Sequence, residues 1–258
     1  MSVDYRRVPP PPALRRWIRA FTYWKAGPAS AGRSPKTATR APSLQIDVYD
    51  DELRWYGIDD AVHRVGGVAL GGVQTRPFAI DAWQPRLVRV LFRPGGTLPF
   101  FPIAPADLAD TQVSAPDRWH LRDRLAAAHD PDELFDLLGR ILTAASVERC
   151  VHPVVARALA VAEGSSGDLT VARLAGEAEV SPKRLIRLFT ADVGIPPKRY
   201  LRLVRFERLR AQVAGRSAVD WTRAAAAFGY FDQSHLIRDF HDFAGMTPSA
   251  YLTRLSSR

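Results

Sequence analysis

The chain has 258 residues, 47% of them hydrophobic, so it is long enough for two domains that each bury a core. Its net charge of +9 favours an anionic partner, and its single cysteine, Cys150, excludes an intramolecular disulfide and a zinc site made of several cysteines. The N-terminus lacks the apolar core of a secretory signal, and no eighteen uncharged apolar residues run together, so we expect a cytoplasmic protein without a membrane partner.

The first half of the chain has the texture of a β-rich domain. Across residues 43–97, short apolar alternations are separated by Gly, Pro and Asp, as in LQIDVY, LRWYGI, FAIDAW and RLVRVLF. Residues 26–42 before them are rich in small residues and helix or strand breakers, which predicts an exposed loop. The run GGVALGG at residues 66–72 lacks the Lys-Ser/Thr of a phosphate-binding loop, so we interpret it as a hairpin or bulge.

From about Arg118 the apolar pattern becomes helical, as in RWHLRDRLAAAH, PDELFDLLGRILTAA and VHPVVARALAVAE. We therefore predict an α+β protein with a β-rich domain at residues 1–117, a helical linker region at 118–150 and an all-α domain at 151–258. These last 108 residues hold 16 Lys and Arg against 10 Asp and Glu. We expect the anionic partner to bind there.

Within the all-α part, one pattern of capped helices occurs twice. Thr170 is a good N-cap for VARLAGEAEV, and Ser181, followed by a proline, opens KRLIRLFTADVG after a short break. In the second pattern Ser217 precedes VDWTRAAAAFGY, Asp232 caps the next helix, and Gly245 ends that helix. Each pattern predicts a helix, a turn and a second helix.

A longer helix separates the two patterns. Pro197 begins KRYLRLVRFERLRAQVAG, an amphipathic segment of about 17 residues that would extend roughly 25 Å. A rod of this length would hold two helix-turn-helix units apart.

The second helix of the first unit has an apolar face and a polar face. At 100° per residue, Leu185, Leu188 and Phe189 gather on one side. The opposite side carries Lys183, Ile186, Arg187 and Thr190, with Arg184 on the flank.

The second helix of the second unit repeats this division. Its apolar residues are Leu236, Phe240 and Phe243, whereas Ser234, His235, Arg238, His241 and Asp242 face away. Gln233 lies at the edge of the apolar face, where a side chain in the first turn can still reach forward. Such helices insert their N-terminal residues into the major groove, where Arg or Lys suits guanine and Gln suits adenine. We expect the polar start of this helix to meet base edges.

Two stretches, VSPKRLIRLFTADVGIPPKRYLRLVRFERL and AFGYFDQSHLIRDFHDFAGMTPSAY, resemble the DNA-binding domain of AraC-type transcriptional regulators over roughly residues 155–252. The resemblance implies two helix-turn-helix units, joined by a long helix, that read adjacent major-groove segments of promoter DNA. Matched onto this chain, the candidate base-reading residues are Lys183, Arg184, Ile186 and Arg187 in the first unit and Gln233, Ser234, His235 and Arg238 in the second. Residues 224–227, AAAA, depart from the family pattern, which usually has larger aliphatic residues at two of these positions.

Affinity for any DNA sequence would come from phosphate contacts, which weaken as salt rises. We expect such contacts from Arg184, Lys198, Arg199 and Arg202.

The elements LRRWIRAFTYW, VRVLFRPGGTLPFF and PADLADTQV resemble an uncharacterised N-terminal domain that accompanies some AraC-type regulators. From that resemblance we expect a domain that senses a small-molecule effector or pairs two copies into a homodimer, and a regulator that works with RNA polymerase. Arg93 would be a candidate ligand for an acidic effector, but a turn that ends a strand is the favoured explanation for Arg93 and the glycines after it.

Two alternatives concern the N-terminal domain, which could be an enzyme or purely a protein-interaction module. The six histidines are scattered, and no HExxH or GxSxG motif occurs, so we expect no enzyme activity, cofactor or metal.

Overall fold

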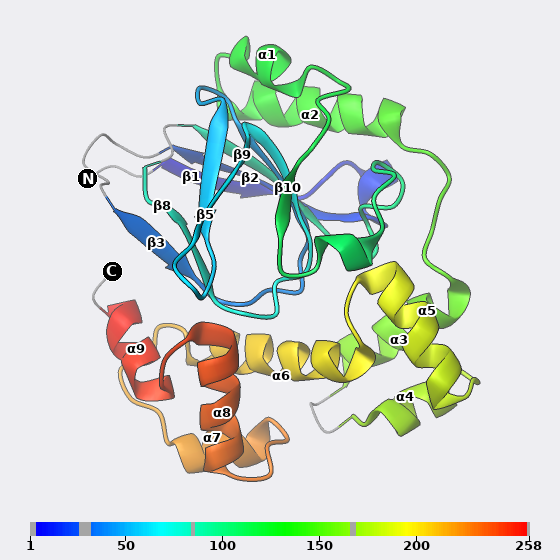
Figure 1. Ribbon diagram of the computed structural model, residues 1–258, viewed down its shortest axis with the longest axis vertical. Helices are drawn as coiled ribbons and strands as arrows, with labels where there is room; N and C mark the ends of the chain where they lie inside the picture. The colour runs from blue at the N-terminus through cyan, green and yellow to red at the C-terminus, as the bar shows by residue number, and fades with distance from the viewer. Residues whose placement is uncertain (1–3, 26–31, 84–85, 166–168, 257–258) are drawn as a thin grey trace.

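The computed structural model describes residues 4–25, 32–83, 86–165 and 169–256. A β-rich N-terminal part lies on a helical C-terminal part, so the fold is α+β as predicted (Figure 1). The β-rich part contains two antiparallel sheets, and the helical part is built around one long central helix.

The larger sheet has six strands in the order β1-β2-β9-β4-β7-β10. Their bounds are Asp4–Val8 for β1, Ile18–Lys25 for β2, Leu87–Phe92 for β9, Ser43–Asp47 for β4, Val68–Gly71 for β7 and Gln112–Ser114 for β10. The smaller sheet has the order β3-β8-β5-β6, with β3 at Arg33–Lys36, β8 at Phe78–Asp81, β5 at Glu52–Tyr56 and β6 at Val62–Gly66. The alternating segments of the sequence correspond to β4, β5, β8 and β9, which confirms those strands.

The six-stranded sheet has one apolar face and one polar face. On the apolar face, Phe21 pairs with Val90 and Val90 with Leu44, and all three belong to one buried cluster. Helices α1 (Leu121–Ala126) and α2 (Pro131–Ala145) cover this face, and their leucines complete the cluster (Figure 1). The expected linker at residues 118–150 therefore contributes part of the core beneath the sheet.

Two local predictions were wrong in part. Residues 33–36 of the expected loop form strand β3, because they pair with β8, and Ala38 is fully buried; residues 26–31 lie outside the described residues. The glycine-rich run at 66–72 is not a hairpin, because β6 and β7 belong to different sheets. Gly67 lies where the chain crosses between them, and a Cβ there would collide with the carbonyl oxygen of Asp50.

The helical part has two groups of helices on the central helix α6 (Pro197–Val213) (Figure 1). One group is α3 (Pro153–Gly164), α4 (Val171–Glu177) and α5 (Pro182–Val193). The other is α7 (Trp221–Ala227), α8 (Gln233–Ala244) and α9 (Pro248–Ser256). The N-cap of α7 is Asp220, whose carboxylate accepts the N–H of Arg223 at 3.0 Å.

The core of the helical part continues into the β-rich part. Ala38 and Val73 of the N-terminal part belong to the same buried cluster as Tyr200, Phe206 and Phe240 of the helices. Apolar packing thus joins the two parts of the chain that lie before and after the predicted boundary near residue 150.

Candidate nucleic-acid interface

The first candidate reading helix, α5, is fixed by its cap and by its apolar face. The hydroxyl of Ser181 accepts the N–H of Arg184 at 3.3 Å, and Pro182 occupies the first helical position. Leu185, Phe189 and Val193 are buried. The helix therefore has one anchored side, and the other side lies in solvent.

The exposed side of α5 carries the predicted residues. Lys183, Arg184 and Arg187 are exposed, and Ile186 is 43% exposed. None of the three basic side chains has an ion-pair partner among the described residues. The first turns of α5 thus present three unpaired cations and one apolar side chain.

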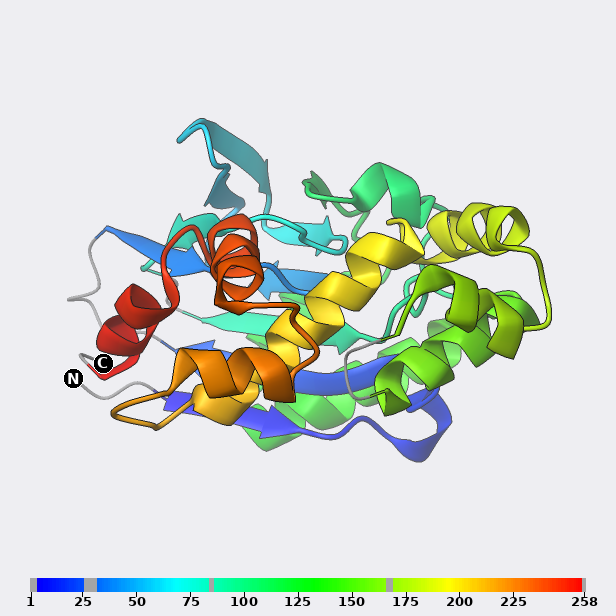
Figure 2. The ribbon, with the colours of Figure 1, turned by 90° about the horizontal axis from the view of Figure 1, so that it is seen from below.

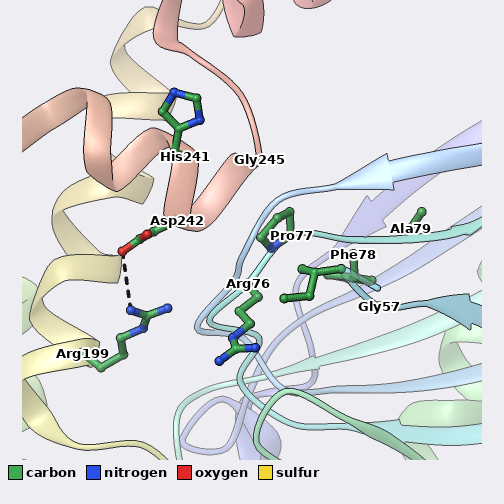
Figure 3. Close-up of a pocket in the computed structure, with 10 residues that line it drawn as sticks. Gly57, Arg76, Pro77, Phe78, Ala79, Arg199, His241, Asp242 and Gly245 are labelled. Carbon is green, nitrogen blue, oxygen red and sulfur yellow. Dashed lines mark ion pairs between the residues drawn. The ribbon is translucent and has the colours of Figure 1, made fainter. Parts of the chain in front are cut away.

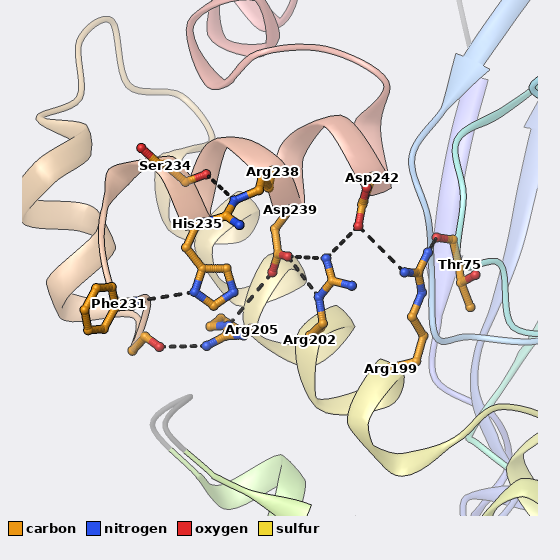
Figure 4. A network of polar contacts seen from close by, with 11 residues as sticks. Thr75, Arg199, Arg202, Arg205, Phe231, Ser234, His235, Arg238, Asp239 and Asp242 are labelled. Atoms are coloured by element: carbon orange, nitrogen blue, oxygen red, sulfur yellow. Dashed lines mark hydrogen bonds and ion pairs between the residues drawn. The ribbon is translucent and has the colours of Figure 1, made fainter.

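The second candidate reading helix, α8, is capped by Asp232, whose carboxylate accepts the N–H of His235 at 2.6 Å. This confirms the cap. Gln233, Ser234 and Arg238 are exposed as predicted, and Arg238 donates from Nε to the carbonyl oxygen of Ser234 at 3.3 Å (Figure 4). Gln233 accepts the hydroxyl of Thr222 through Oε1 at 3.2 Å, so its amide NH₂ group stays available as a donor.

His235 is half-buried, which the helical projection did not reveal. Its ring lies edge-on to Tyr230, and its Nδ1 accepts the N–H of Phe231 at 3.5 Å (Figure 4). Burial lowers the pKa of His235, and nearby arginines lower it further, although Asp239 acts in the opposite direction. A neutral imidazole that accepts at Nδ1 carries its hydrogen on Nε2, so this side chain would donate from Nε2.

Phe231, at the turn in front of α8, is 93% exposed. The sequence analysis did not single it out, because it precedes the cap and belongs to no apolar stripe. A helical projection that includes the residue before the cap would have marked it as an apolar side chain on the reading side.

A buried carboxylate joins α8 to the central helix (Figure 4). Asp239 is fully buried, and its Oδ1 accepts from Arg202 Nη2 at 2.6 Å and from Nε at 3.0 Å. Arg202 also binds Asp242 at 2.6 Å, and Arg205 Nε lies 4.0 Å from Asp239 Oδ2. Arg205 donates from Nη1 to the carbonyl oxygen of Gly229 in the turn before α8. This network fixes α8 and its preceding turn on α6.

The electrostatics follow from this burial. Burial lowers the pKa of Arg202, but the hydrogen bonds to Asp239 and Asp242 outweigh it, so the pKa lies above its usual value. For Tyr230, burial and the Asp239 charge both raise the pKa. Both side chains therefore keep their usual charge states at neutral pH.

Two of the expected phosphate contacts are occupied within the protein. Arg202 is paired with Asp239 and Asp242, and Arg199 donates from Nη2 to the carbonyl oxygen of Thr75 at 2.8 Å and lies 3.7 Å from Asp242. The periodicity of α8 could have indicated this, since Asp239 falls beside Leu236 and Phe240 on the apolar face. Lys198 and Arg184 remain exposed.

A hollow of about 710 Å³ lies between the two groups of helices. Thr170 and Val171 line it from the first group, Lys198 and Leu201 from α6, and Arg238 from the second group, together with the other lining residues Leu169, Arg202, Arg205, His235 and Asp242. Both helix-turn-helix units thus border one concave, predominantly basic surface.

The β-rich part contacts the other end of each reading helix. The carbonyl oxygen of Phe243, near the end of α8, accepts the N–H of Ala38 at 2.7 Å. Gly194, the C-cap of α5, lies against Pro105 in the 3₁₀ helix η2 (Pro105–Leu108). The N-terminal turns of α5 and α8, where the candidate residues lie, are left uncovered.

A second pocket, of about 680 Å³, separates the end of α8 from the smaller sheet (Figure 3). Arg199, His241 and Asp242 line it from the helical part, and Arg76 and Pro77 line it from the β-rich part. The candidate base-reading residues do not line this pocket.

Two kinds of feature are absent from the residues that the structure describes. No helix among them is long and apolar enough to cross a membrane. No three His, Cys, Asp or Glu side chains lie close enough together to hold a metal ion in these same residues.

Two protein-family models match the chain. The model described as "Helix-turn-helix domain" matches residues 174–254, and the model described as "Domain of unknown function (DUF6597)" matches residues 6–114. No curated protein matches the sequence.

Among solved structures, the chain resembles ToxT from Vibrio cholerae O395 over its whole length. The two are 7% identical with a TM-score of 0.51, and the match covers 100% of this chain and 98% of ToxT. This likeness shows a shared fold.

Two further matches cover less than half of the chain. The C-terminal domain of AraT from Geobacillus stearothermophilus is 26% identical, with a TM-score of 0.37, over 43% of this chain and 89% of that one. A DNA-binding transcriptional dual regulator from Escherichia coli K-12 is 24% identical, with a TM-score of 0.36, over 43% of this chain and 100% of that one.

Proposed function

We propose that this chain is a DNA-binding transcription regulator of the AraC type in which α5 and α8 read two adjacent major-groove segments of promoter DNA. Its support is the helix-turn-helix domain model that matches residues 174–254, behind a domain of unknown function at residues 6–114. The observation that carries this proposal is that both helices are capped, anchored by one apolar face, and uncovered at their N-terminal turns. Figure 2 shows the group of α5 on one side of α6, a helix of 17 residues, and the group of α8 on the other side. Helix α8 packs along α6 beside Arg202 and Arg205.

Within this proposal the exposed side chains have separate roles. Arg187 and Arg238 are suited to guanine, and the free amide NH₂ of Gln233 to an acceptor on a base edge. Ile186 and Phe231 provide apolar surface for thymine methyl groups. Lys183, Ser234 and His235 complete the set of base-reading residues that we propose.

We propose that two of the four residues expected from the sequence bind phosphates. Arg184 and Lys198 are exposed and unpaired, which supports phosphate contacts for them. Arg199 and Arg202 are engaged with carboxylates, so we assign them to positioning α8. The basic hollow between the two units is suited to the sugar-phosphate strand that separates two adjacent major grooves.

For the N-terminal part we propose a sensing or dimerisation role, with α1 and α2 as part of that domain and the helical domain beginning near residue 151. Its support is the contact that this part makes with the C-terminal ends of both reading helices. Through these contacts, a ligand or a second copy bound to the N-terminal part could alter how the helices meet DNA and RNA polymerase. A structure of ToxT from Vibrio cholerae O395, which shares the fold, has (E)-4-(8-methylnaphthalen-1-yl)but-3-enoic acid bound, and this supports the proposal of a small-molecule effector here.

The test is selection of DNA from a random library by the full-length protein at fixed, near-physiological salt. We expect an enriched motif of two blocks about one helical turn apart. Arg187→Ala should relax one block and Arg238→Ala the other, each at a loss of about 1–3 kcal/mol on the selected site and little on random DNA.

The matched control is Arg118→Ala, an exposed arginine of the N-terminal part far from both reading helices in sequence. It should leave the selected motif and the affinity unchanged. If Arg187→Ala and Arg238→Ala weaken selected and random DNA equally, these arginines bind phosphates. If no motif is enriched, two-helix reading by this chain is wrong or requires an effector, and repeating the selection with added candidate effectors separates these outcomes.

A further inference from the structure

A basic cavity lies between the β-rich part and the helical part. It has a volume of about 510 Å³ and is enclosed by both sheets, by α6 and by α9. Eight Lys and Arg side chains line it, and Glu207 is its single carboxylate among the described residues. This excess of positive charge is confined to a space between two packed parts, where water shields charges less than at the surface.

Glu207 does not compensate Arg89, because Arg40 already uses both oxygens of Glu207. The Nε of Arg40 donates to Glu207 Oε2 at 2.8 Å, and its backbone N–H donates to Oε1 at 2.9 Å. Arg40 also binds Glu163 and the hydroxyl of Tyr200, so this pair is a saturated contact between the two parts.

A row of polar side chains crosses the sheet face that looks into the cavity. Arg7 on β1 pairs with Thr22 on β2, Thr22 with Arg89 on β9, and Arg89 with Gln45 on β4. Residues directly opposite each other in neighbouring strands point to the same face, so these four share the face that α1 and α2 do not cover. Thr22 and Gln45, the neighbours of Arg89 on either side in this row, are both buried.

Arg89 is the least compensated cation of this row. Its Nε is buried and has no hydrogen-bond partner, and it forms no ion pair with any described carboxylate. Burial lowers its pKa, and only Tyr5 acts against that effect. A buried guanidinium nitrogen normally has a hydrogen-bond partner, and no described residue provides one for Arg89 Nε.

We propose that this cavity binds a small organic anion through a carboxylate or phosphate group held by Arg89. The planar fork of a guanidinium matches both groups with two parallel hydrogen bonds. Ile80, Leu91 and Tyr251 give the cavity an apolar wall for the body of such a ligand, and its volume lies in the range of small-molecule sites.

The cavity also explains how an anion could regulate this protein. Arg89 belongs to the β-rich part, whereas Tyr251 and Arg210 belong to the helical part, and Arg210 already donates to the hydroxyl of Thr37 at 3.0 Å. An anion in contact with both walls would strengthen their docking and change the position of α6, which carries both reading helices. This regulatory consequence rests on the proposed DNA-reading function, but anion binding itself does not.

The test measures anion binding to the full chain without DNA. Thermal unfolding is followed with inorganic phosphate, succinate or benzoate at an ionic strength held constant with sodium chloride, and with neutral benzamide for comparison. We expect at least one anion to raise the unfolding temperature of the wild type, and benzamide to leave it unchanged. The anion that acts tells a phosphate ligand from a carboxylate ligand.

Arg89→Met retains the length of the side chain and removes its charge, and Arg118→Met is the matched control. By calorimetry, Arg89→Met should bind the active anion about ten- to a hundredfold more weakly, whereas Arg118→Met should bind it like the wild type. Without anion, Arg89→Met should unfold at the same temperature as the wild type or higher, because a buried charge without a partner has been removed.

Three results would overturn the inference. They are the absence of any anion-specific stabilisation of the wild type, equal stabilisation of wild type and Arg89→Met, and a marked fall in the unfolding temperature of Arg89→Met without anion. The last result would make Arg89 a structural arginine. Failure of the protein to select DNA would leave the binding measurements unaffected.

Discussion

Replacement of the buried carboxylate between α6 and α8 gives the sharpest test of how the second reading unit is held. Asn at position 239 keeps the shape of Asp239 and removes its charge. Removing one partner of a buried ion pair costs about 3–5 kcal/mol, but Arg202 is 25% exposed and retains Asp242, so we expect about 2–4 kcal/mol for Asp239→Asn. Against a total of roughly 5–15 kcal/mol for a typical domain, this is a large loss.

Asp242→Asn is the matched control, because Asp242 binds the same arginine at the same 2.6 Å but is 46% exposed. An exposed pair contributes about 0–1 kcal/mol, so Asp242→Asn should cost less than about 1 kcal/mol. Equilibrium unfolding in urea, followed by far-UV circular dichroism with the m-value checked for each variant, gives both free energies. Equal losses in the two variants would refute the assignment of Asp239 as the buried anchor of α8.

A double variant separates loss of charge from loss of packing. In Arg202→Met with Asp239→Leu, an apolar pair replaces the ion pair, and such replacements are often neutral or stabilising. We therefore expect the double variant to be more stable than Asp239→Leu alone. If the double variant is the less stable of the two, Arg202 has a further role that does not depend on Asp239.

Two further predictions concern a titrating side chain and two glycines. Burial lowers the pKa of His235 below its ordinary 6.5, so its contribution to stability should be fully present above that pH and should fall below it, as the unfolded imidazole takes up a proton. His235→Gln should reduce this fall. The measurement is the urea midpoint of each protein at about pH 5.5 and 7.5. Gly194 has φ +94° and no room for a Cβ beside Pro105, so Gly194→Ala should lower the free energy of unfolding by more than about 1 kcal/mol. Gly176 lies in an open position of α4, so Gly176→Ala should raise the free energy of unfolding by about 0.5–1 kcal/mol in the same urea assay. A pH dependence that His235→Gln does not change, or glycine effects of the same sign, would contradict these expectations.

The sequence could predict what depends on local chemistry. Caps such as Ser181 and Asp232 act within three residues, and the apolar faces of α5 and α8 repeat with the helical period, so both were found correctly. The alternating strands were found for the same reason, because each carries its own period of two.

What the sequence could not predict depends on contacts between distant segments. Strand β3 contains a proline and follows a segment rich in small residues and breakers, and it forms because it pairs with β8. Arg202 looks like any exposed basic residue of an amphipathic helix until α8 places Asp239 37 residues away against it. Likewise, α1 and α2 resemble a linker in sequence, and their role in the core becomes visible only once the apolar face of the sheet is known.

The way the two parts are docked bears on regulation. The β-rich part contacts α5 at its end through η2, α8 at its end through Ala38, and α6 between them through Arg40 and Glu207. The β-rich part therefore helps to fix the position of both reading helices, and α6 alone does not set the distance between α5 and α8. A shift of the β-rich part of even a fraction of an ångström relative to α6 would move both reading ends, because packed helices respond as units and not by gradual deformation. The basic cavity lies at this same contact, so an anion that neutralises Arg89 would act where the two reading helices and the β-rich part are mechanically joined.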